Sequence, residues 1–432
     1  MKKILVVLLA ITMVAASFTA CGKSENDEPI KIENNDDSNN QETNVEVETE
    51  AEEIINPVTE EGNNEPMKEI PKRESIDSKA MIGFNQFDHD FITFASNMNA
   101  GENYSISPIS LKMALALLTA GAEGNTLNEL LAATGFSSVE EYIAWCKSAD
   151  GIQMSDKENS ISIGYGIWHN SDKDGEFKKE YKEQFKGLDV EFAEEKGTKL
   201  QGSINKWVDN KTNGLIPELI PFTLEESVNT LVNTIYLKGG WVFPFEEHNT
   251  TTGEFVDING NIVEKDFMHQ EDDFLYYEDS KTQMVIMPLT NGCSIAFVLG
   301  EDTAITEKIS EAKSQLVNIS LPKFETDTSI DSLKPYLQEI GVKDAFEDTA
   351  NFSAMMDCPT KVDEVLQKTK VIVDENGVEA AAATAVIMME NAAFISEEPK
   401  PVYFTADVPF SYFIYSDMTG DMELLFYGEY VK

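Results

Sequence analysis

Cysteine is scarce in this sequence, with four residues among 432. One of them, Cys21, ends an apolar N-terminal segment, and the others are Cys146, Cys293 and Cys358. These last three cysteines are an odd number and lack Cys-x-x-Cys spacing, so they indicate neither a zinc site nor a disulfide framework. We therefore expect these three residues to be free thiols, buried in the folded part of the chain.

Histidine is equally rare, and its four positions show no catalytic or metal-binding spacing. They are His89, His169, His248 and His269, and none belongs to a His-Glu-x-x-His pair. The sequence also lacks a phosphate-binding glycine loop and the Gly-x-Ser-x-Gly turn of serine hydrolases. We predict that the protein is not an enzyme and binds neither a metal ion nor a cofactor.

Positive charge is the third deficit. The chain has 33 lysines and arginines against 77 aspartates and glutamates, a formal net charge of −44. The acidic excess persists after the first 74 residues are set aside. Nucleic acid binding depends on basic patches that release counterions from phosphates, so nucleic acid is excluded as a partner.

The first 21 residues have the pattern of a secretion signal. Lys2 and Lys3 precede an apolar run from Ile4 to Val14, which is too short for a membrane span. The ending Phe18-Thr19-Ala20-Cys21 resembles a bacterial lipobox, although Phe18 replaces the usual aliphatic residue. This pattern predicts lipidation of Cys21 and attachment to the outer face of a bacterial membrane. The alternative is an ordinary signal peptide that is cleaved nearby, which would leave the protein secreted.

Residues 22–74 form a second segment, rich in Glu, Asp, Asn and Ser, with 17 acidic and 5 basic side chains. Such a composition cannot bury enough apolar surface to offset its ordering entropy. We predict an extended, self-repelling tether. A metal-binding or adhesive role is the alternative, but the spacing does not require one.

Residues 75–432 have enough apolar runs to build one large domain. Helical patterns that look amphipathic cover Ser110 to Thr119 and Thr126 to Ala133, whereas Val285 to Leu289 and Ile295 to Leu299 resemble buried strands. The two kinds of pattern mix without βαβ alternation. The expected fold class is therefore α+β.

A segment near the C-terminus, Asp374 to Val386, fits two structures. Its alanines favour a helix that Asp374 or Asn376 could cap. Under a period of two, however, one face carries only uncharged and mostly small residues, which could enter a sheet without burying an unpaired charge. This face consists of Val378, Ala380, Ala382, Thr384, Val386 and Met388. A segment that can be a loop, a helix or a central strand can act as a switch.

The same segment resembles the hinge of the serpin family, a Glu-x-Gly-x-Glu-Ala-Ala-Ala pattern that precedes an exposed loop. Further similar blocks follow in the family's order over about residues 76 to 432. They are Asn103 to Ser110, Gly121 to Thr126, Asn205 to Val208, Leu231 to Gly239 with Trp241 and Phe245, Leu321 to Phe324, and Phe404 to Phe410. The resemblance implies three β-sheets, eight or nine helices and a reactive-centre loop over about residues 375–401.

The resemblance also implies a function, the suicide inhibition of a protease that becomes covalently attached as an acyl-enzyme. Counting from Glu375 places the scissile bond between Asn391 and Ala392, within two or three residues. The neighbouring candidates are Met389, Glu390, Ala393 and Phe394. No Lys or Arg occurs from residue 371 to 399, so the expected targets are elastase-like or subtilisin-like serine proteases, with papain-like cysteine proteases second.

Site residues follow from the same resemblance. The hinge consists of Glu375, Gly377, Val378, Glu379, Ala380, Ala381, Ala382, Ala383 and Thr384. Ser107, Ser110, Asn233 and Gln367 correspond to the shutter, which holds the central strands together, and Trp241 to the breach, where the hinge enters. Simple helix capping is the alternative role for the two serines.

Two positions depart from the family pattern. Gln367 stands where many members have histidine, and Val378 replaces the usual Thr or Ser. Both residues are uncharged, so we still expect the loop to insert into the sheet. We also expect the protein to act as a monomer. The rival functions are a non-inhibitory binding or carrier protein of the same fold, and a surface lipoprotein that binds a polymer or small ligand.

Overall fold

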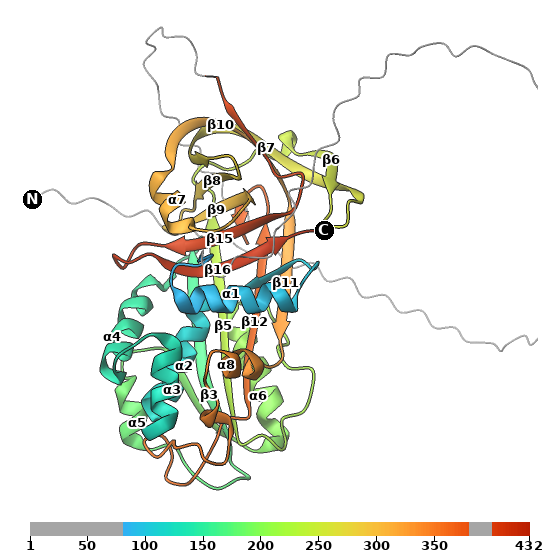
Figure 1. Cartoon of the computed structure of the whole chain (residues 1–432). Coiled ribbons are helices and arrows are strands. Elements are labelled where there is room, and N and C mark those ends of the chain that lie inside the picture. The colour runs from blue at the N-terminus through green and yellow to red at the C-terminus, as the bar shows by residue number, and fades with distance from the viewer. Residues whose placement is uncertain (1–80, 380–399) are drawn as a thin grey trace, which may run out of the picture. The chain divides into compact units, whose positions relative to one another are not determined.

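The computed structural model describes residues 81–379 and 400–432. The predicted signal segment and tether lie outside this range. Helices and strands mix without βαβ alternation, which confirms the α+β prediction (Figure 1). The described residues contain eight α-helices: α1 (Gln86–Met98), α2 (Pro108–Gly121), α3 (Gly124–Thr134), α4 (Val139–Ala149), α5 (Lys179–Gln184), α6 (Gly197–Lys211), α7 (Ile305–Glu311) and α8 (Lys334–Glu339). Three short 3-10 helices are η1 (Asp150–Ile152), η2 (Glu247–Asn249) and η3 (Asp344–Phe346).

The smaller of two sheets contains seven strands in the order β11-β12-β13-β5-β3-β2, with β4 also paired to β3. These strands are β2 (Met154–Ser155), β3 (Ser160–Asn170), β4 (Val190–Glu195), β5 (Asn229–Gly240), β11 (Phe324–Ile330), β12 (Glu364–Val373) and β13 (Gly377–Val378). Strand β13 lies between β12 and β5, and those two also pair directly with each other. The smaller sheet is therefore continuous at one place and divided by a two-residue strand at another.

The larger sheet contains nine strands in the order β1-β16-β15-β9-β8-β7-β10-β14, with β6 also paired to β7. They are β1 (Tyr104–Ile106), β6 (Thr251–Val256), β7 (Ile262–Glu278), β8 (Thr282–Pro288), β9 (Cys293–Gly300), β10 (Lys313–Pro322), β14 (Val402–Thr405), β15 (Phe410–Ser416) and β16 (Glu423–Tyr430). The predicted strands 285–289 and 295–299 correspond to β8 and β9, which begin three and two residues earlier than predicted.

The expected three sheets are present as two hydrogen-bonded networks because β7 is unusually long. Its first part pairs with β6 and β10, and from Leu275 onward it also pairs with β8. Two of the expected sheets are thus joined through one 17-residue strand. In Figure 1 this joined sheet occupies one end of the described domain, and the strands of the smaller sheet run from it toward helices α2 to α6.

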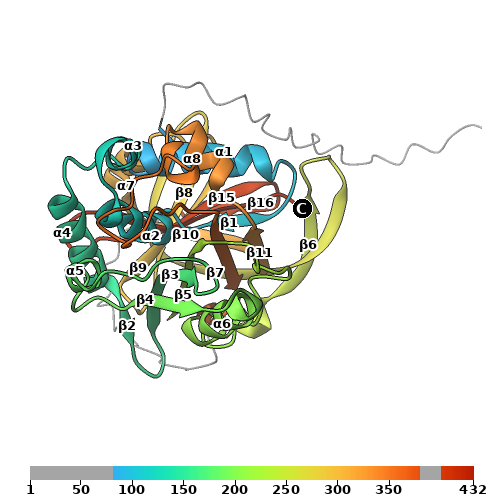
Figure 2. The same ribbon diagram turned by 90° about the horizontal axis from the view of Figure 1, so that it is seen from below.

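Two helices cover opposite faces of the smaller sheet. Figure 2 shows α2 on one side of β3 and β5 and α6 on the other. Leu200, Ile204 and Val208 of α6 pack against Trp168 and Val232 of the sheet in a separate small core. The larger core fills the side of α2 and continues between the two sheets.

The central helix α2 differs from the sequence expectation. A helix over residues 110–119 is present, but every residue of α2 is buried, so its pattern is not amphipathic. Ser107 caps its start by accepting a hydrogen bond from the Ser110 amide, and Pro108 occupies the first turn. Helix α3 is amphipathic as predicted, with Thr126, Leu130 and Thr134 on its buried face.

Cys146, Cys293 and Cys358 are free in the described part of the chain, as predicted, although Cys358 is only half-buried. Among the described helices, none combines the length and apolar character that crossing a bilayer requires.

Candidate functional site

The site lies where β12 and β5 separate. Over residues 364–368 of β12 and 230–234 of β5 the two strands pair directly and in parallel. Farther along, β13 lies between them and is antiparallel to both, with Val378 opposite Gly239 and Val373. The hinge therefore has its first two strand residues already inside the sheet, at the boundary between its open and closed parts.

Gln367 connects the closed part of the sheet to α2. Its Nε2 atom lies 2.6 Å from Oδ1 of Asn233, 2.9 Å from the carbonyl oxygen of Ser107 and 3.2 Å from Oγ of Ser110. Its Oε1 atom accepts a 3.0 Å hydrogen bond from the Ser107 amide. One amide group thus contacts a neighbouring strand and the first turn of the central helix.

Asn233 and Ser110 complete the network. The Ser110 hydroxyl donates to Oδ1 of Asn233 at 2.9 Å, and Nδ2 of Asn233 donates to the carbonyl oxygen of Leu366 at 2.9 Å. All four predicted shutter residues are at most 1% exposed. Ser107 is also the helix cap, and its contacts with Gln367 are compatible with that role. None of the four side chains titrates near neutral pH, so the contacts among them do not depend on pH.

At the open end, backbone hydrogen bonds fix the chain that enters β13. Trp241 donates its indole N–H to the carbonyl oxygen of Asp374 at 2.9 Å and its amide to that of Asn376 at 2.9 Å. The Phe245 amide donates to the carbonyl oxygen of Glu375 at 3.0 Å. The Asp374 carboxylate accepts from the Asn376 amide and closes the turn from within. Trp241 therefore contacts the segment that leads into β13.

The carboxylate of Glu375 is held by two side chains, Lys323 between β10 and β11 and Thr250 just before β6. Lys323 Nζ lies 2.9 Å from Oε2, and the Thr250 hydroxyl donates to Oε1 at 2.7 Å. Although burial raises the pKa of Glu375, the hydrogen bonds from Lys323 and Thr250 bring it below its ordinary value. The start of the hinge is thus held by charge as well as by its backbone.

Gly377 is required by its surroundings. Its φ is +149°, and a Cβ atom there would lie 2.2 Å from the carbonyl oxygen of Gly239. Val378 follows with its side chain in the core, 2% exposed. Glu379 then leaves the strand at φ +46° with its carboxyl on the opposite face, so adjacent hinge residues alternate as a strand requires.

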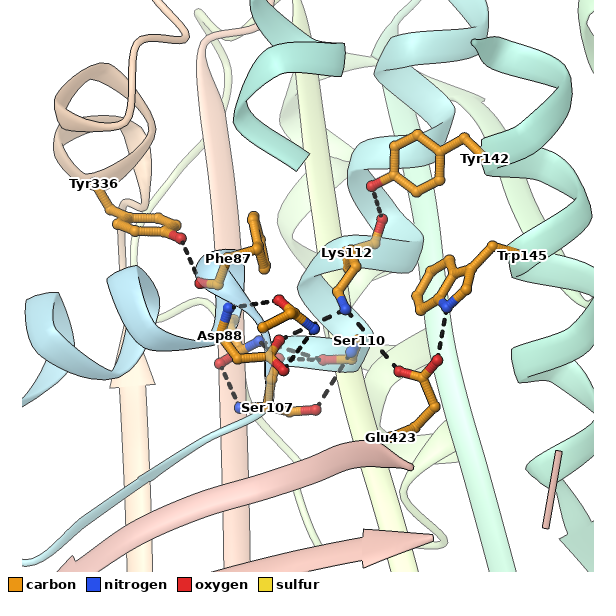
Figure 3. Close-up of polar contacts among 11 residues, drawn as sticks. Phe87, Asp88, Ser107, Ser110, Lys112, Tyr142, Trp145, Tyr336 and Glu423 are labelled. Atoms are coloured by element: carbon orange, nitrogen blue, oxygen red, sulfur yellow. Dashed lines mark hydrogen bonds and ion pairs between the residues drawn. The ribbon is translucent and has the colours of Figure 1, made fainter. Parts of the chain in front are cut away.

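A buried ionic cluster lies next to the shutter (Figure 3). Lys112 of α2 places Nζ 3.6 Å from Oδ1 of Asp88 in α1 and 4.0 Å from Oε2 of Glu423 in β16. Trp145 of α4 donates to Glu423 at 2.7 Å, and its ring lies 4.8 Å from the Lys112 ammonium. Burial raises the pKa of Asp88 to about 6, with Lys112 opposing the shift. The cluster joins α1, α4 and β16 to the helix that begins at the shutter.

Several predicted site residues lie outside the described part of the chain. They are Cys21, the hinge residues Ala380 to Thr384, and the candidate reactive-bond residues Met389, Glu390, Asn391, Ala392, Ala393 and Phe394. Sequence reasoning missed Lys323, Thr250 and the buried Lys112 cluster. Only the block Leu321 to Phe324, which contains Lys323, carried a signal for any of them. The described residues include no group of three His, Cys, Asp or Glu side chains that could hold a metal ion.

Comparison with known proteins gives the family. A sequence model described as serpin (serine protease inhibitor) matches residues 82–432. An uncharacterized serpin-like protein of Methanosarcina mazei is 29% identical over 390 residues, covering 83% of this chain and 90% of that relative.

Two solved structures extend the comparison. The native state of tengpin, a thermophilic serpin, matches with a TM-score of 0.70 and 27% identity, covering 83% of this chain and 95% of that chain. Human thyroxine-binding globulin matches with a TM-score of 0.72, covering 80% of this chain and 96% of that one, but at 22% identity this likeness shows the fold alone. The chain belongs to the serpin family, whose members are in general inhibitors of proteases and not themselves enzymes.

Proposed function

We propose that this protein is a suicide-substrate inhibitor of extracellular serine proteases, acting by insertion of its cleaved loop into the smaller sheet. The observation that carries the proposal is the position of β13. Gly377 and Val378 already pair with β5 and β12, and the inward side chain, Val378, is uncharged and buried. The sheet is parted where the hinge enters and closed by hydrogen bonds beyond it.

Continued along the chain, the pairing register of β13 predicts the neighbours of an inserted strand. Val378 pairs with Gly239 and Val373, so six residues farther along an antiparallel strand Thr384 would lie opposite Asn233 and Gln367. Thr384 belongs to the inward face, together with Ala380 and Ala382. Insertion would therefore replace the direct contact between Gln367 and Asn233 with contacts to the Thr384 hydroxyl, which can both donate and accept a hydrogen bond.

The chemistry of capture belongs to the protease. Its Ser or Cys nucleophile attacks the carbonyl of the residue before the scissile bond, near Asn391, and forms an ester or thioester while the new amino terminus, near Ala392, departs. An inserted strand from residue 378 to 391 would span ~45 Å at about 3.3 Å per residue. The attached protease would be carried that distance before water completes the hydrolysis.

The sequence of the loop supports the choice of target. No Lys or Arg occurs between residues 371 and 399, which argues against enzymes that require a basic residue before the cut. Elastase-like and subtilisin-like serine proteases accept the small and apolar residues present, and papain-like cysteine proteases are the second class.

For location, we propose that Cys21 is lipidated and that residues 22–74 act as a spacer at the outer face of a bacterial membrane, with the inhibitor acting as a monomer. Burial of an acyl chain contributes about 0.8 kcal/mol per methylene. Expression of the full chain and of Cys21→Ala in a bacterial host, followed by membrane fractionation, tests this. Lipidation predicts that only the variant is released, and equal retention of both would contradict it.

The inhibitory function is tested with residues 22–432 incubated with pancreatic elastase, subtilisin, chymotrypsin, trypsin and papain. We expect a complex stable to heat and detergent on a denaturing gel with elastase or subtilisin, and a new amino terminus between Glu390 and Ile395. A complex formed only with trypsin would contradict the assigned loop. Cleavage without a complex and without a gain in thermal stability would favour a non-inhibitory protein of the same fold.

A further inference from the structure

Glu379 occupies the point where the described hinge leaves the smaller sheet. Its amide donates a 3.1 Å hydrogen bond to the carbonyl oxygen of Ile372 in β12, so its backbone is still attached to the strand. Its φ of +46° turns the chain away from the extended conformation. Val378 packs in the larger core, whereas the Glu379 carboxyl interacts with Tyr236, which also interacts with Asn213 just after α6.

The carboxyl of Glu379 is only partly compensated by its neighbours. Tyr236 and Lys238 of β5 and Lys370 of β12 are the titratable groups that interact with it. Tyr236 also interacts with the Asn213 side chain, just after α6, and Lys370 Nζ lies 2.6 Å from Oε1 of Glu325 and 4.0 Å from Oδ2 of Asp327. The Oε2 atom of Glu379 is buried and has no hydrogen-bond partner among the described residues.

Partial burial of a carboxyl group with one unpartnered oxygen disfavours its ionised form. Burial is the largest influence and raises the pKa of Glu379 to about 7, while Tyr236, Lys238 and Lys370 act in the opposite direction. Release of the backbone at residue 379 breaks the hydrogen bond to Ile372 and returns the carboxylate to water. Ionisation of the side chain is therefore coupled to the position of the hinge.

We propose that Glu379, seated against Tyr236, acts as a pH-dependent latch that holds the hinge in the sheet when protonated and releases it when ionised. The latch itself follows from the described contacts, and only its effect on protease capture rests on the proposed inhibitory function. Acidification would keep Gly377 and Val378 between β12 and β5 and shorten the loop available to a protease. Neutral pH would free these residues and lengthen it.

The direction follows from linkage. In the docked hinge the pKa of Glu379 is about 7, and after release into water it returns to its ordinary value of 4.5. Docking is then strongest below pH 4.5, weakens as pH rises toward 7 and is weakest above 7. The full difference in pKa corresponds to a change of about 300-fold in the docking equilibrium. Because the side chain is partly exposed, we expect a smaller change, about ten- to hundredfold between pH 5 and pH 8.

Hydrogen exchange of residues 22–432 measures the latch without any protease. Exchange of the Glu379 amide, divided by its intrinsic chemical rate at each pH, reports the docked fraction. We expect its protection to fall about ten- to hundredfold from pH 5 to pH 8 in the wild type and to stay constant in Glu379→Gln, which is neutral throughout. A segment of β8, residues 284–287, serves as the internal control with pH-independent protection. The same pH profile in the wild type and Glu379→Gln would overturn the proposal.

Tyr236→Phe provides a second test, the pH midpoint of the change in Glu379 amide protection. A purely structural role of Tyr236 would not shift this midpoint. Because Tyr236 lowers the pKa of Glu379, its removal should shift the transition to higher pH. An unchanged midpoint would overturn the assignment of Tyr236 as the contact. If hydrogen exchange shows the pH transition but no covalent complex forms with a protease at any pH, the latch is supported and the inhibitory function is contradicted. Complexes without a transition would contradict the latch alone.

Discussion

The Nε2 atom of Gln367 lies 2.6 Å from Oδ1 of Asn233, and this contact marks the place where the smaller sheet changes from closed to open. On one side of it β12 and β5 pair directly, and on the other β13 lies between them. The same Gln367 amide binds both backbone groups of Ser107 at the start of α2. Opening of the sheet beyond this point therefore requires the contacts of Gln367, and the hydrogen bonds from Asn233 to Leu366 and from Thr234 to Lys368, to be exchanged.

Substitution of Gln367 should weaken the closed part of the sheet. Gln367→Leu leaves the buried Ser107 amide without a partner and removes one of the two donors to Oδ1 of Asn233. The unsatisfied amide alone costs about 1–3 kcal/mol. We expect a lower midpoint of denaturant unfolding and faster spontaneous loss of inhibitory activity on storage. Gln367→His is the matched variant, because its ring can supply a donor and an acceptor. The stability of Gln367→His should be closer to that of the wild type at pH 8. It should fall below about pH 6.5, where the charged imidazole ring can no longer accept a hydrogen bond. A stability unchanged in Gln367→Leu would contradict the role of this contact.

Gly377→Ala should expel β13 from the sheet, since the added Cβ would meet the Gly239 carbonyl oxygen. Loss of exchange protection at residues 377–379 is the expected result, with the remainder of the smaller sheet unaffected. Gly101→Ala is the control. Its φ is +82°, but nothing lies within 4 Å of the added atom, so only about 1 kcal/mol of strain is expected. Retained protection in Gly377→Ala would show that the hinge does not lie between β5 and β12 in solution.

Lys323 and Glu375 should show a measurable coupling. Lys323 is partly exposed, so we expect about 1 kcal/mol in a double-mutant cycle of Lys323→Met and Glu375→Gln on unfolding. Because the pKa of Glu375 is lowered in the folded protein, its stabilising effect is present above its ordinary value of 4.5 and is lost as pH falls through the lowered value. A coupling energy that is zero at pH 7, or that grows on acidification, would disagree with this arrangement.

Lys112→Met should destabilise the native state by about 3 kcal/mol, because Asp88 and Glu423 would remain buried near each other without their shared cation. The pKa of Asp88 is already about 6, and removal of Lys112 would raise it further. The loss of stability should therefore be smaller at pH 5, where Asp88 accepts a proton, than at pH 8. Thermal unfolding at both values measures this difference, with Lys147→Met, at the end of α4, as a control. An equal loss at both pH values would exclude Asp88 as the group left unpaired.

Local patterns in the sequence predicted much of the fold. The apolar runs at residues 285–289 and 295–299 predicted β8 and β9 because the signal for these strands lies in residues adjacent in the sequence. The period of two around Val378 and Glu379 placed these side chains on opposite faces, as the structure has them. The alanine-rich hinge segment taken alone, however, favoured a helix. Its period of two and then the resemblance to a family favoured a strand.

The remaining features depend on contacts between distant parts of the chain. Lys112 lies within an apolar stretch, and Asp88 and Glu423 from other elements allow its charge to be buried. The joining of two sheets through β7 depends on which strands approach its two ends. The raised pKa of Glu379 arises from its position between β12 and β5, and no local pattern predicts that position.

Insertion of the cleaved loop along its inward face is the step that would trap the protease, and a pair of adjacent substitutions distinguishes this face from the opposite one. In the register of β13, an inserted Ala382 would face the core, whereas an inserted Ala381 would face the α6 side opposite Tyr236 and Lys370, next to a cavity of about 580 Å³. The measurement is the stoichiometry of inhibition of the protease that forms a covalent complex. Ala381→Arg should retain the complex, and Ala382→Arg should be cleaved as an ordinary substrate with at least a tenfold higher stoichiometry. Equal stoichiometries for the two variants would contradict insertion along this face.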